Sequence, residues 1–266
     1  LDRVHLFYQL AHEAAKPLFK TQYLDRISFH PNFLSYVDRA FMKEAGSNSV
    51  VDFLPSYLWQ LPRVFSEFNH MNVFMITVSP MDKHGYFSLG TSCDYSSTVA
   101  GDCDMLMVEV NKHMPRVFGE NLVHVSQVHS IVENDVPLIQ LLDKPATAKD
   151  IKIGAMIAEL VPDGACLQFG IGSIPNSVAL SLLGHKDLGI HTEMLTSSVA
   201  DLYEAGTVTN VRKNIHKYKT VFTLCWGSQR LYHLIDDNPS IISYPAWHIN
   251  DPAVIQQNDN VISVNS

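Results

Sequence analysis

The sequence predicts an α/β protein with mostly parallel sheets. Short, nearly continuous apolar runs at residues 72–78 and 105–110 are typical of strands that are buried on both faces. Other segments, such as residues 32–45, carry apolar residues at helical spacing. Strands that alternate with helices favour βαβ units, and such units build parallel sheets.

The first part of the chain contributes one helix and three strands to this prediction. The helix covers residues 32–45, with Asn32 as its expected N-cap. The first two strands are the runs named above. Residues 122–125 form a third apolar run, which we expect to be a strand of the same buried, parallel kind.

The loop that follows the first of these strands, residues 79–86, has two interpretations. Asp82, Lys83 and His84 are residue types that take part in catalysis. A proline and a glycine bracket them, however, as in an ordinary turn. The turn is the simpler interpretation, and the sequence leaves both open.

A polar segment at residues 143–150 is the best linker in the chain. It contains a proline, and Thr147 with Asp150 gives a helix N-terminal capping signal. An amphipathic helix is expected to follow, with apolar residues at i, i+3, i+4 and i+7. These residues are Ile153, Met156, Ile157 and Leu160. We therefore divide the chain into residues 1–142 and 143–266.

The second part begins with a strand at residues 165–169, a glycine loop at residues 170–176 and a helix that starts at Ser177. A further strand at residues 188–193 then brings Glu193 to its end. Sites in parallel sheets form beyond the carboxyl ends of strands, so we expect Glu193 to lie near the glycine loop.

The glycine loop suits the binding of a phosphate or of a developing oxyanion. Glycines let backbone N–H groups point outward, and a helix N-terminus adds positive dipole character. The loop residues concerned are Gly170, Ile171, Gly172, Ser173 and Ile174. A tight turn that only reverses the chain explains the same pattern. The dinucleotide-binding fingerprint is incomplete, because Pro175 and Asn176 stand where its third glycine is expected, which argues against a nicotinamide oxidoreductase.

Glu193 also has two interpretations. A carboxylate at a helix start or in a salt bridge is the ordinary explanation. A carboxylate beside His191 and Met194 at the end of an apolar strand can instead attack an acyl carbon, which divides one difficult reaction step into easier ones. Asn265, near the end of the chain, carries an amide that can donate to a substrate oxygen.

Composition excludes several function classes. The net charge of −8 over 266 residues argues against nucleic acid or an anionic membrane as partner. The sequence has no apolar run long enough to span a membrane and no signal-peptide pattern at its start, so we expect a cytoplasmic protein. The thirteen histidines show no metal-ligand spacing, and no metal is expected. The four cysteines form no C-x-x-C pair and are expected to be buried free thiols.

Taken together, the motifs resemble the acetyl-CoA hydrolase/transferase family, and within it the 4-hydroxybutyrate CoA-transferase type. The matching segments keep the order and spacing of that family. They are residues 78–86, 108–115, 163–176, 187–194, 227–232, 238–239 and 250–255.

The resemblance implies two tandem, similar α/β domains with a CoA-transferase or NagB/RpiA-like fold, of which the first is expected to lack its start and the second its end. It implies that Glu193 is the nucleophile and that the loop from Gly170 to Ile174 contacts CoA and the acyl oxygen. His191, Met194 and Asn265 are expected to line the substrate pocket.

The implied activity is CoA transfer between a short-chain acyl-CoA (acetyl-, butyryl- or 4-hydroxybutyryl-CoA) and a carboxylic acid such as acetate. It runs by a ping-pong mechanism through a glutamyl-CoA thioester, in a homodimer, with CoA as substrate and no permanently bound cofactor. Two alternatives remain open: an acetyl-CoA hydrolase, in which water resolves the thioester, and a non-catalytic fragment that binds CoA.

Overall fold

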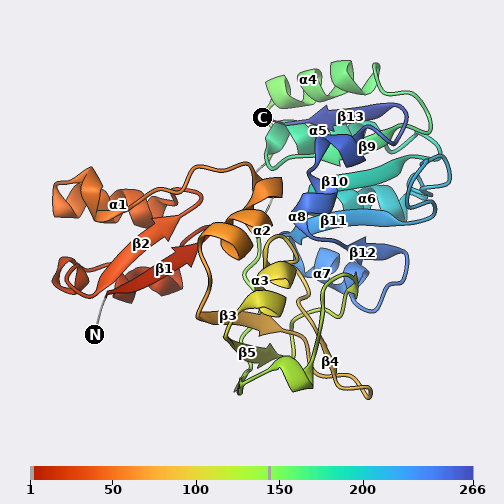
Figure 1. Cartoon of the computed structure of the whole chain (residues 1–266). Helices are drawn as coiled ribbons and strands as arrows, with labels where there is room; N and C mark the ends of the chain where they lie inside the picture. The colour runs from red at the N-terminus through yellow and green to blue at the C-terminus, as the bar shows by residue number, and fades with distance from the viewer. Residues whose placement is uncertain (1–2, 143–144, 266) are drawn as a thin grey trace. The chain divides into compact units, whose positions relative to one another are not determined.

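The computed structural model describes residues 3–142 and 145–265 and confirms a mixed α/β fold with mostly parallel sheets (Figure 1). The chain forms two compact units, Leu1–Tyr57 and Leu58–Ser266. The domain boundary predicted between residues 142 and 143 adjoins residues 143–144, which lie outside the described residues. That division therefore stays a prediction.

The first unit is a parallel strand pair with one helix. Strand β1 (Val4–Tyr8) pairs with β2 (Ile27–Pro31), and α1 (Tyr36–Ala45) follows. Two short 3-10 helices, η1 (Glu13–Leu18) and η2 (Thr21–Tyr23), lie between β1 and β2, and a third, η3 (Asn48–Val50), follows α1. The core of this unit is aromatic: the Phe19 and Phe29 rings stack with centroids 4.5 Å apart.

The predicted N-cap of the first helix is wrong, because α1 begins three residues later than expected. Ser35 is the N-cap, and it forms a reciprocal capping box with Asp38. The Asn32 side chain instead donates to the Leu54 carbonyl oxygen. The Ser35 hydroxyl accepts from the first N–H groups of the helix, and the Asp38 side chain binds back to the Ser35 N–H. These reciprocal bonds favour a helix start at Ser35 over one at Asn32.

The second unit contains the remaining elements. Its strands are β3 (Val73–Val78), β4 (Tyr86–Ser88), β5 (Met105–Asn111), β6 (Phe118–Gly119), β7 (Leu122–His124), β8 (Ser130–Asn134), β9 (Cys166–Phe169), β10 (Gly189–Leu195), β11 (Thr220–Cys225), β12 (Ile241–Ser243) and β13 (Val261–Val264). Its helices are α2 (Leu61–Arg63), α3 (Ser96–Asp102), α4 (Ala148–Ala158), α5 (Ser173–Ser181), α6 (Ser197–Glu204), α7 (Gln229–Ile235), α8 (Ala246–Ile249) and α9 (Pro252–Ile255). Short helical turns η4 (Leu58–Gln60), η5 (Val64–Phe68) and η6 (Val125–Gln127) complete it.

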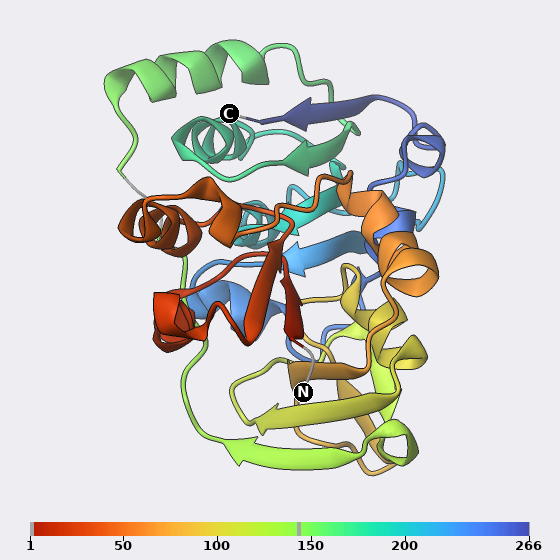
Figure 2. The same ribbon diagram turned by 60° about the vertical axis from the view of Figure 1, so that its left-hand side comes forward.

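A six-stranded parallel sheet organises this unit, in the order β13-β9-β10-β11-β12-β6. In Figure 2 the dark-blue β13 runs beside the teal β9. Strand β6 comes from the first half of the sequence and joins β12 at the edge. At this join a Cβ on Gly119 would lie 2.0 Å from the Ser243 carbonyl oxygen, so only glycine fits.

A second, three-stranded parallel sheet has the order β3-β5-β8, which confirms the strands predicted at residues 72–78 and 105–110. The third apolar run behaves differently. Strand β7 pairs antiparallel with β4 in a separate two-stranded sheet, so its predicted parallel pairing is wrong. A three-residue run has no periodicity that separates the two pairings, and the direction of the partner strand decides.

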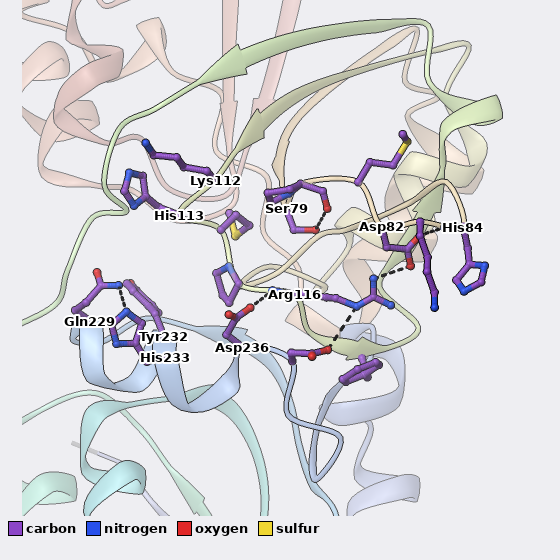
Figure 3. Close-up of a pocket in the computed structure, with 17 residues that line it drawn as sticks. Ser79, Asp82, His84, Lys112, His113, Arg116, Gln229, Tyr232, His233 and Asp236 are labelled. Carbon is purple, nitrogen blue, oxygen red and sulfur yellow. Dashed lines mark hydrogen bonds and ion pairs between the residues drawn. The ribbon is translucent and has the colours of Figure 1, made fainter.

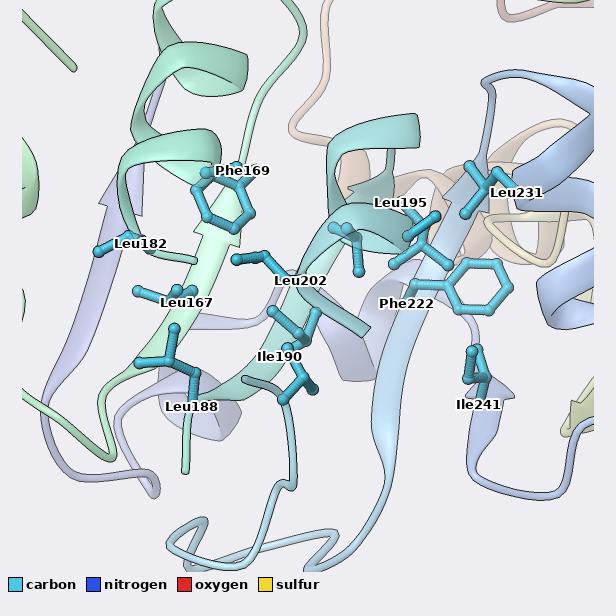
Figure 4. Packing of buried hydrophobic residues seen from close by; sticks show 14 of the residues in the cluster. Leu167, Phe169, Leu182, Leu188, Ile190, Leu195, Leu202, Phe222, Leu231 and Ile241 are labelled. Atoms are coloured by element: carbon cyan, nitrogen blue, oxygen red, sulfur yellow. The ribbon is translucent and has the colours of Figure 1, made fainter. Parts of the chain in front are cut away.

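The core of the six-stranded sheet explains its continuous apolar strands (Figure 4). Leu167 from β9, Ile190 from β10 and Phe222 from β11 are fully buried beneath the helices α5, α6 and α7. Each such side chain contributes about 1.5–3 kcal/mol by leaving water. This packing fixes the neighbouring strands β9 and β10, whose carboxyl ends carry the predicted site.

Helix α4 confirms the predicted helix after the linker, including its Thr147–Asp150 capping box. Only part of its predicted apolar face is buried: Ile157 packs against the core, whereas Met156 and Leu160 are 59% and 76% exposed. The helix instead buries its small residues, Gly154 and Ala158, against α5. A Cβ on Gly154 would lie 2.8 Å from the Ser177 Cβ, so close helix contact selects small side chains over large ones.

Two element boundaries near the predicted site also differ from expectation. Helix α5 begins at Ser173, directly after Gly172, because Pro175 is tolerated in the first turn of a helix. Strand β10 continues to Leu195, so Glu193 lies within the strand rather than after it. Within the described ranges, 3–142 and 145–265, no helix is both long and apolar enough to cross a bilayer.

Candidate active site

Glu193 lies near the carboxyl end of β10 with its side chain half-buried. Side chains alternate along a strand, so Ile190 enters the core while His191 and Glu193 point to the opposite face. Helix α8 lies on that face, against β10 and β11 (Figure 1). The strand therefore directs Glu193 away from the hydrophobic core and toward α8.

Asn250, which caps the C-terminus of α8, holds the Glu193 carboxylate. Its Nδ2 donates to Glu193 Oε2 at 2.5 Å, across 57 residues of sequence. Burial raises the pKa of Glu193, and the hydrogen bond from Asn250 partly offsets this rise. A raised pKa makes a carboxylate more basic and hence a better nucleophile once it is ionised.

His191 anchors the same turn from the strand side. It is buried, at 3% exposure, and its Nε2 donates to the Ile249 carbonyl oxygen at 2.9 Å. Burial lowers its pKa to about 4, so the ring is neutral near pH 7. His191 and Glu193 thus bind two consecutive residues, Ile249 and Asn250. The direct contact of His191 in this structure is to the protein backbone.

The glycine loop follows β9, the neighbour of β10. Gly172 has φ +142°, a backbone conformation that residues other than glycine rarely adopt. It precedes α5, which has no side-chain N-cap. The first backbone N–H groups of α5 are therefore not capped by a side chain. Ile171 is 44% exposed, and Ser173 and Ile174 are half-buried.

A single hydroxyl connects the two strand ends. Thr192 Oγ1 accepts from the Phe169 backbone N–H at 3.2 Å and lies within hydrogen-bond distance of the Phe169 and Met194 carbonyl oxygens. This contact places Thr192 level with Phe169. The strands pair Gly189 with Cys166 and Ile190 with Leu167, and extending this register brings Glu193 level with Gly170. The predicted proximity of the carboxylate and the glycine loop therefore follows from the register.

The other predicted pocket residues lie at the same edge. Asn265 exchanges two side-chain hydrogen bonds with Gln168, at 3.0 and 3.2 Å. A Cβ on Gly170 would lie 2.5 Å from Asn265 Oδ1, so glycine allows this close approach. Met194 is half-buried next to Glu193. The predicted residues are thus gathered at the carboxyl ends of β9, β10 and β13.

Sequence reasoning assigned no separate role to two residues of this site. Asn250 directly precedes Asp251, whose side chain caps α9 by accepting from the Ala253 N–H. Asp94 is 3% exposed, and its carbonyl oxygen accepts from the Ala246 N–H at the start of α8. Burial raises the pKa of Asp94 to about 6, against hydrogen bonds from Ser96, and the charge of Glu193 adds to the rise. No local pattern distinguishes either residue.

A cavity of about 840 Å³ lies elsewhere in the second unit, between the loops that follow β3 and β5 and helix α7 (Figure 3). Neither Glu193 nor the glycine loop lines it. Asp82 accepts from the backbone N–H groups of His84 and Tyr86 and from Arg116, at 2.6 to 2.9 Å. These bonds support the turn interpretation of residues 79–86.

Comparison with known proteins identifies the family of this chain. The family model for the acetyl-CoA hydrolase/transferase N-terminal domain matches residues 2–143, and the model for the C-terminal domain matches residues 227–266. This chain belongs to the acetyl-CoA hydrolase/transferase family. The predicted family is confirmed.

Individual relatives of the family are similar over most of the chain. A succinyl-CoA:cyclohexane-1-carboxylate CoA transferase of Geobacter metallireducens is 40% identical over 96% of this chain and 57% of its own length. The chain thus spans about half the length of the curated relatives that it matches.

Two solved structures share the fold. RipA from Yersinia pestis superposes with a TM-score of 0.94 at 43% identity, covering 97% of this chain and 61% of RipA. A 4-hydroxybutyrate CoA-transferase from Porphyromonas gingivalis gives a TM-score of 0.82 at 35% identity, covering 98% and 68%. These similarities confirm the predicted CoA-transferase fold class.

Proposed function

We propose that the complete protein is a CoA transferase in which Glu193 is the nucleophile. One observation carries the proposal: a half-buried carboxylate with a raised pKa is held by Asn250 at the strand edge shared with the glycine loop. A nucleophilic carboxylate needs this combination of a partly dry site and nearby donors.

The reaction begins when a Glu193 carboxylate oxygen attacks the thioester carbonyl carbon of acyl-CoA. The carbon–sulfur bond breaks, CoA leaves as a thiolate, and a mixed anhydride with Glu193 forms. The thiolate then attacks the Glu193 carbonyl carbon, which releases the first carboxylic acid as its carboxylate and leaves a glutamyl-CoA thioester. The same steps in reverse, with a second carboxylate, place CoA on the new acid and free Glu193.

Each tetrahedral intermediate carries a negative oxygen that the site is suited to stabilise. The uncapped N–H groups at the start of α5 and the Asn250 amide are the donors at this edge. A well-placed donor of this kind contributes on the order of 10²- to 10³-fold in rate. Within the described residues, Asn250 Oδ1 is buried without a protein partner, so it can accept a hydrogen bond from a substrate N–H.

The names of the relatives support the substrate class, because they specify short-chain or cyclic carboxylates and CoA esters. We expect a short-chain acyl-CoA and an acceptor such as acetate, with CoA as a substrate. The cytoplasmic location, the homodimer and the absence of a permanent cofactor stay predictions.

The test uses the complete polypeptide with acyl-CoA, with and without an acceptor acid. After loading with acyl-CoA, hydroxylamine or borohydride treatment should change the mass of the peptide that contains Glu193. Glu193→Gln should abolish both turnover and the mass change. Glu159→Gln, an exposed acid on the turn after α4, is the matched control and should leave both intact.

Two outcomes would change the assignment. Turnover that does not depend on an acceptor acid would identify a hydrolase, because water then resolves the thioester. Full turnover by Glu193→Gln, or binding of CoA without any mass change at Glu193, would reject the nucleophile.

A further inference from the structure

Two histidines meet behind the candidate site. His216 Nε2 and His248 Nε2 lie 2.8 Å apart, and each ring also packs on Tyr244 with centroids 5.0 and 4.9 Å away. A bond between two ring nitrogens needs one N–H donor and one lone pair. If both rings carry a proton on each nitrogen, the two N–H groups face each other and the contact cannot persist.

One partner of this pair belongs to a loop that holds β10. Residues 205–219 connect α6 to β11, and two side chains of this loop bind both backbone groups of Ile190. Asn210 Oδ1 accepts from the Ile190 N–H at 2.9 Å, and Lys213 Nζ donates to its carbonyl oxygen at 2.8 Å. His216 has φ +52°, so the loop keeps an unfavourable backbone conformation where it reaches His248.

The other partner belongs to α8, which has only four residues and cannot be stable by itself. Its position depends on contacts from outside. Asp94 O receives the Ala246 N–H at 2.8 Å, His191 donates to Ile249 O, and His216 contacts His248. Asn250, which directly follows α8, donates to Glu193.

The surroundings keep both imidazoles neutral near pH 7. Burial lowers the pKa of His216 to about 4, and the charges of His248 and Lys213 add to this effect. Burial also lowers the pKa of His248, against Glu120 and Asp251, which raise it. Two other titratable groups lie close by. They are Tyr244, in ring contact with both histidines, and His191, on β10.

We propose that His216 and His248 form a positioning pair that holds α8 so that Asn250 reaches Glu193, and that acid releases this pair. The role rests on the proposed function, since it acts through Asn250 on the nucleophile. Neither histidine is proposed to touch substrate. Through this pair, the loop between α6 and β11 helps to set the position of the Glu193 carboxylate on β10.

The first test measures acyl-CoA transfer against pH. His248→Phe should lower kcat by roughly 10- to 100-fold with the KM for acyl-CoA nearly unchanged, because a small displacement of a positioning group costs about this much. His248→Gln keeps a hydrogen-bonding side chain, so it should restore kcat but lose the part of the acid limb that belongs to the pair. His233→Phe, an exposed histidine on α7, is the control and should behave as wild type.

The second test does not need activity. Nuclear magnetic resonance can follow the Asn250 side-chain amide while the two imidazoles titrate. We expect one part of the Asn250 shift to follow the midpoint of the pair and to vanish in His248→Gln, whereas the part caused by protonation of Glu193 remains in both proteins. The Asn238 side chain, which donates to the Leu234 carbonyl oxygen, should not follow the pair.

The two proposals fail separately. Full activity of Glu193→Gln rejects the proposed function, and the contact between the pair and Asn250 is then judged by the resonance measurement, which does not need activity. If Glu193→Gln is inactive but His248→Phe keeps its kcat and acid limb, the positioning role is rejected. An Asn250 amide that ignores the titration of His216 and His248 rejects the positioning role whatever the activity is.

Discussion

Lys213 allows a quantitative test of the loop that holds β10. The residue is 2% exposed, and its Nζ donates to the carbonyl oxygens of Ile190 and Lys219 at 2.8 and 2.7 Å. Among the described residues no carboxylate forms a salt bridge with it. Burial of the ammonium group lowers its pKa from 10.5 to about 8.

The direction of the pH effect follows from linkage. Between the folded and unfolded pKa values the unfolded chain binds more protons, so stability rises as pH rises through this window. Each pH unit contributes about 1.4 kcal/mol. Going from about pH 7 to about pH 9.5 crosses roughly 1.5 units above the folded pKa, so Lys213 should add about 2 kcal/mol to the free energy of unfolding.

The assay compares urea unfolding of wild type and Lys213→Met at both pH values, so that other titrating groups cancel. The difference in unfolding free energy should move by about 2 kcal/mol in favour of wild type as pH rises. Lys152→Met, an exposed lysine on α4, should show no such change. A wild-type minus Lys213→Met difference that stays constant, or moves the opposite way, would refute the assigned cost of the buried charge.

Three stability predictions can be checked by the same unfolding assay. Thr147→Ala removes the α4 cap that closes on Asp150 and should cost about 1 kcal/mol; an unchanged midpoint would contradict it. Thr192→Val removes the hydroxyl that connects the ends of β9 and β10, and should cost about 1–3 kcal/mol because buried backbone groups lose a partner. Gly119→Ala forces a Cβ against the Ser243 carbonyl oxygen and should cost about 3 kcal/mol or more, whereas Gly184→Ala, where a Cβ meets nothing, should be tolerated.

Local sequence signals predicted much of the fold. The apolar runs of β3 and β5 and the Thr147–Asp150 cap were predicted correctly, because each depends on residues that are adjacent in the chain. Sequence patterns that occur in more than one structural environment gave wrong predictions. Met156 of α4 is exposed because the contact with α5 requires the small Gly154, and the short run of β7 found an antiparallel partner.

By itself the sequence determined the family, the α/β class and the strand that carries Glu193, since these depend on motif order and on hydrophobic periodicity. Only the tertiary structure decided what surrounds this carboxylate. Asp94 is far in sequence from His248 and Asn250, which belong to α8 and its C-terminal cap, and their contacts arise when packing of the sheet core brings α8 against β10. A hydrogen bond across 57 residues leaves no periodic trace in either segment, so the donor to Glu193 can be found only in the folded chain.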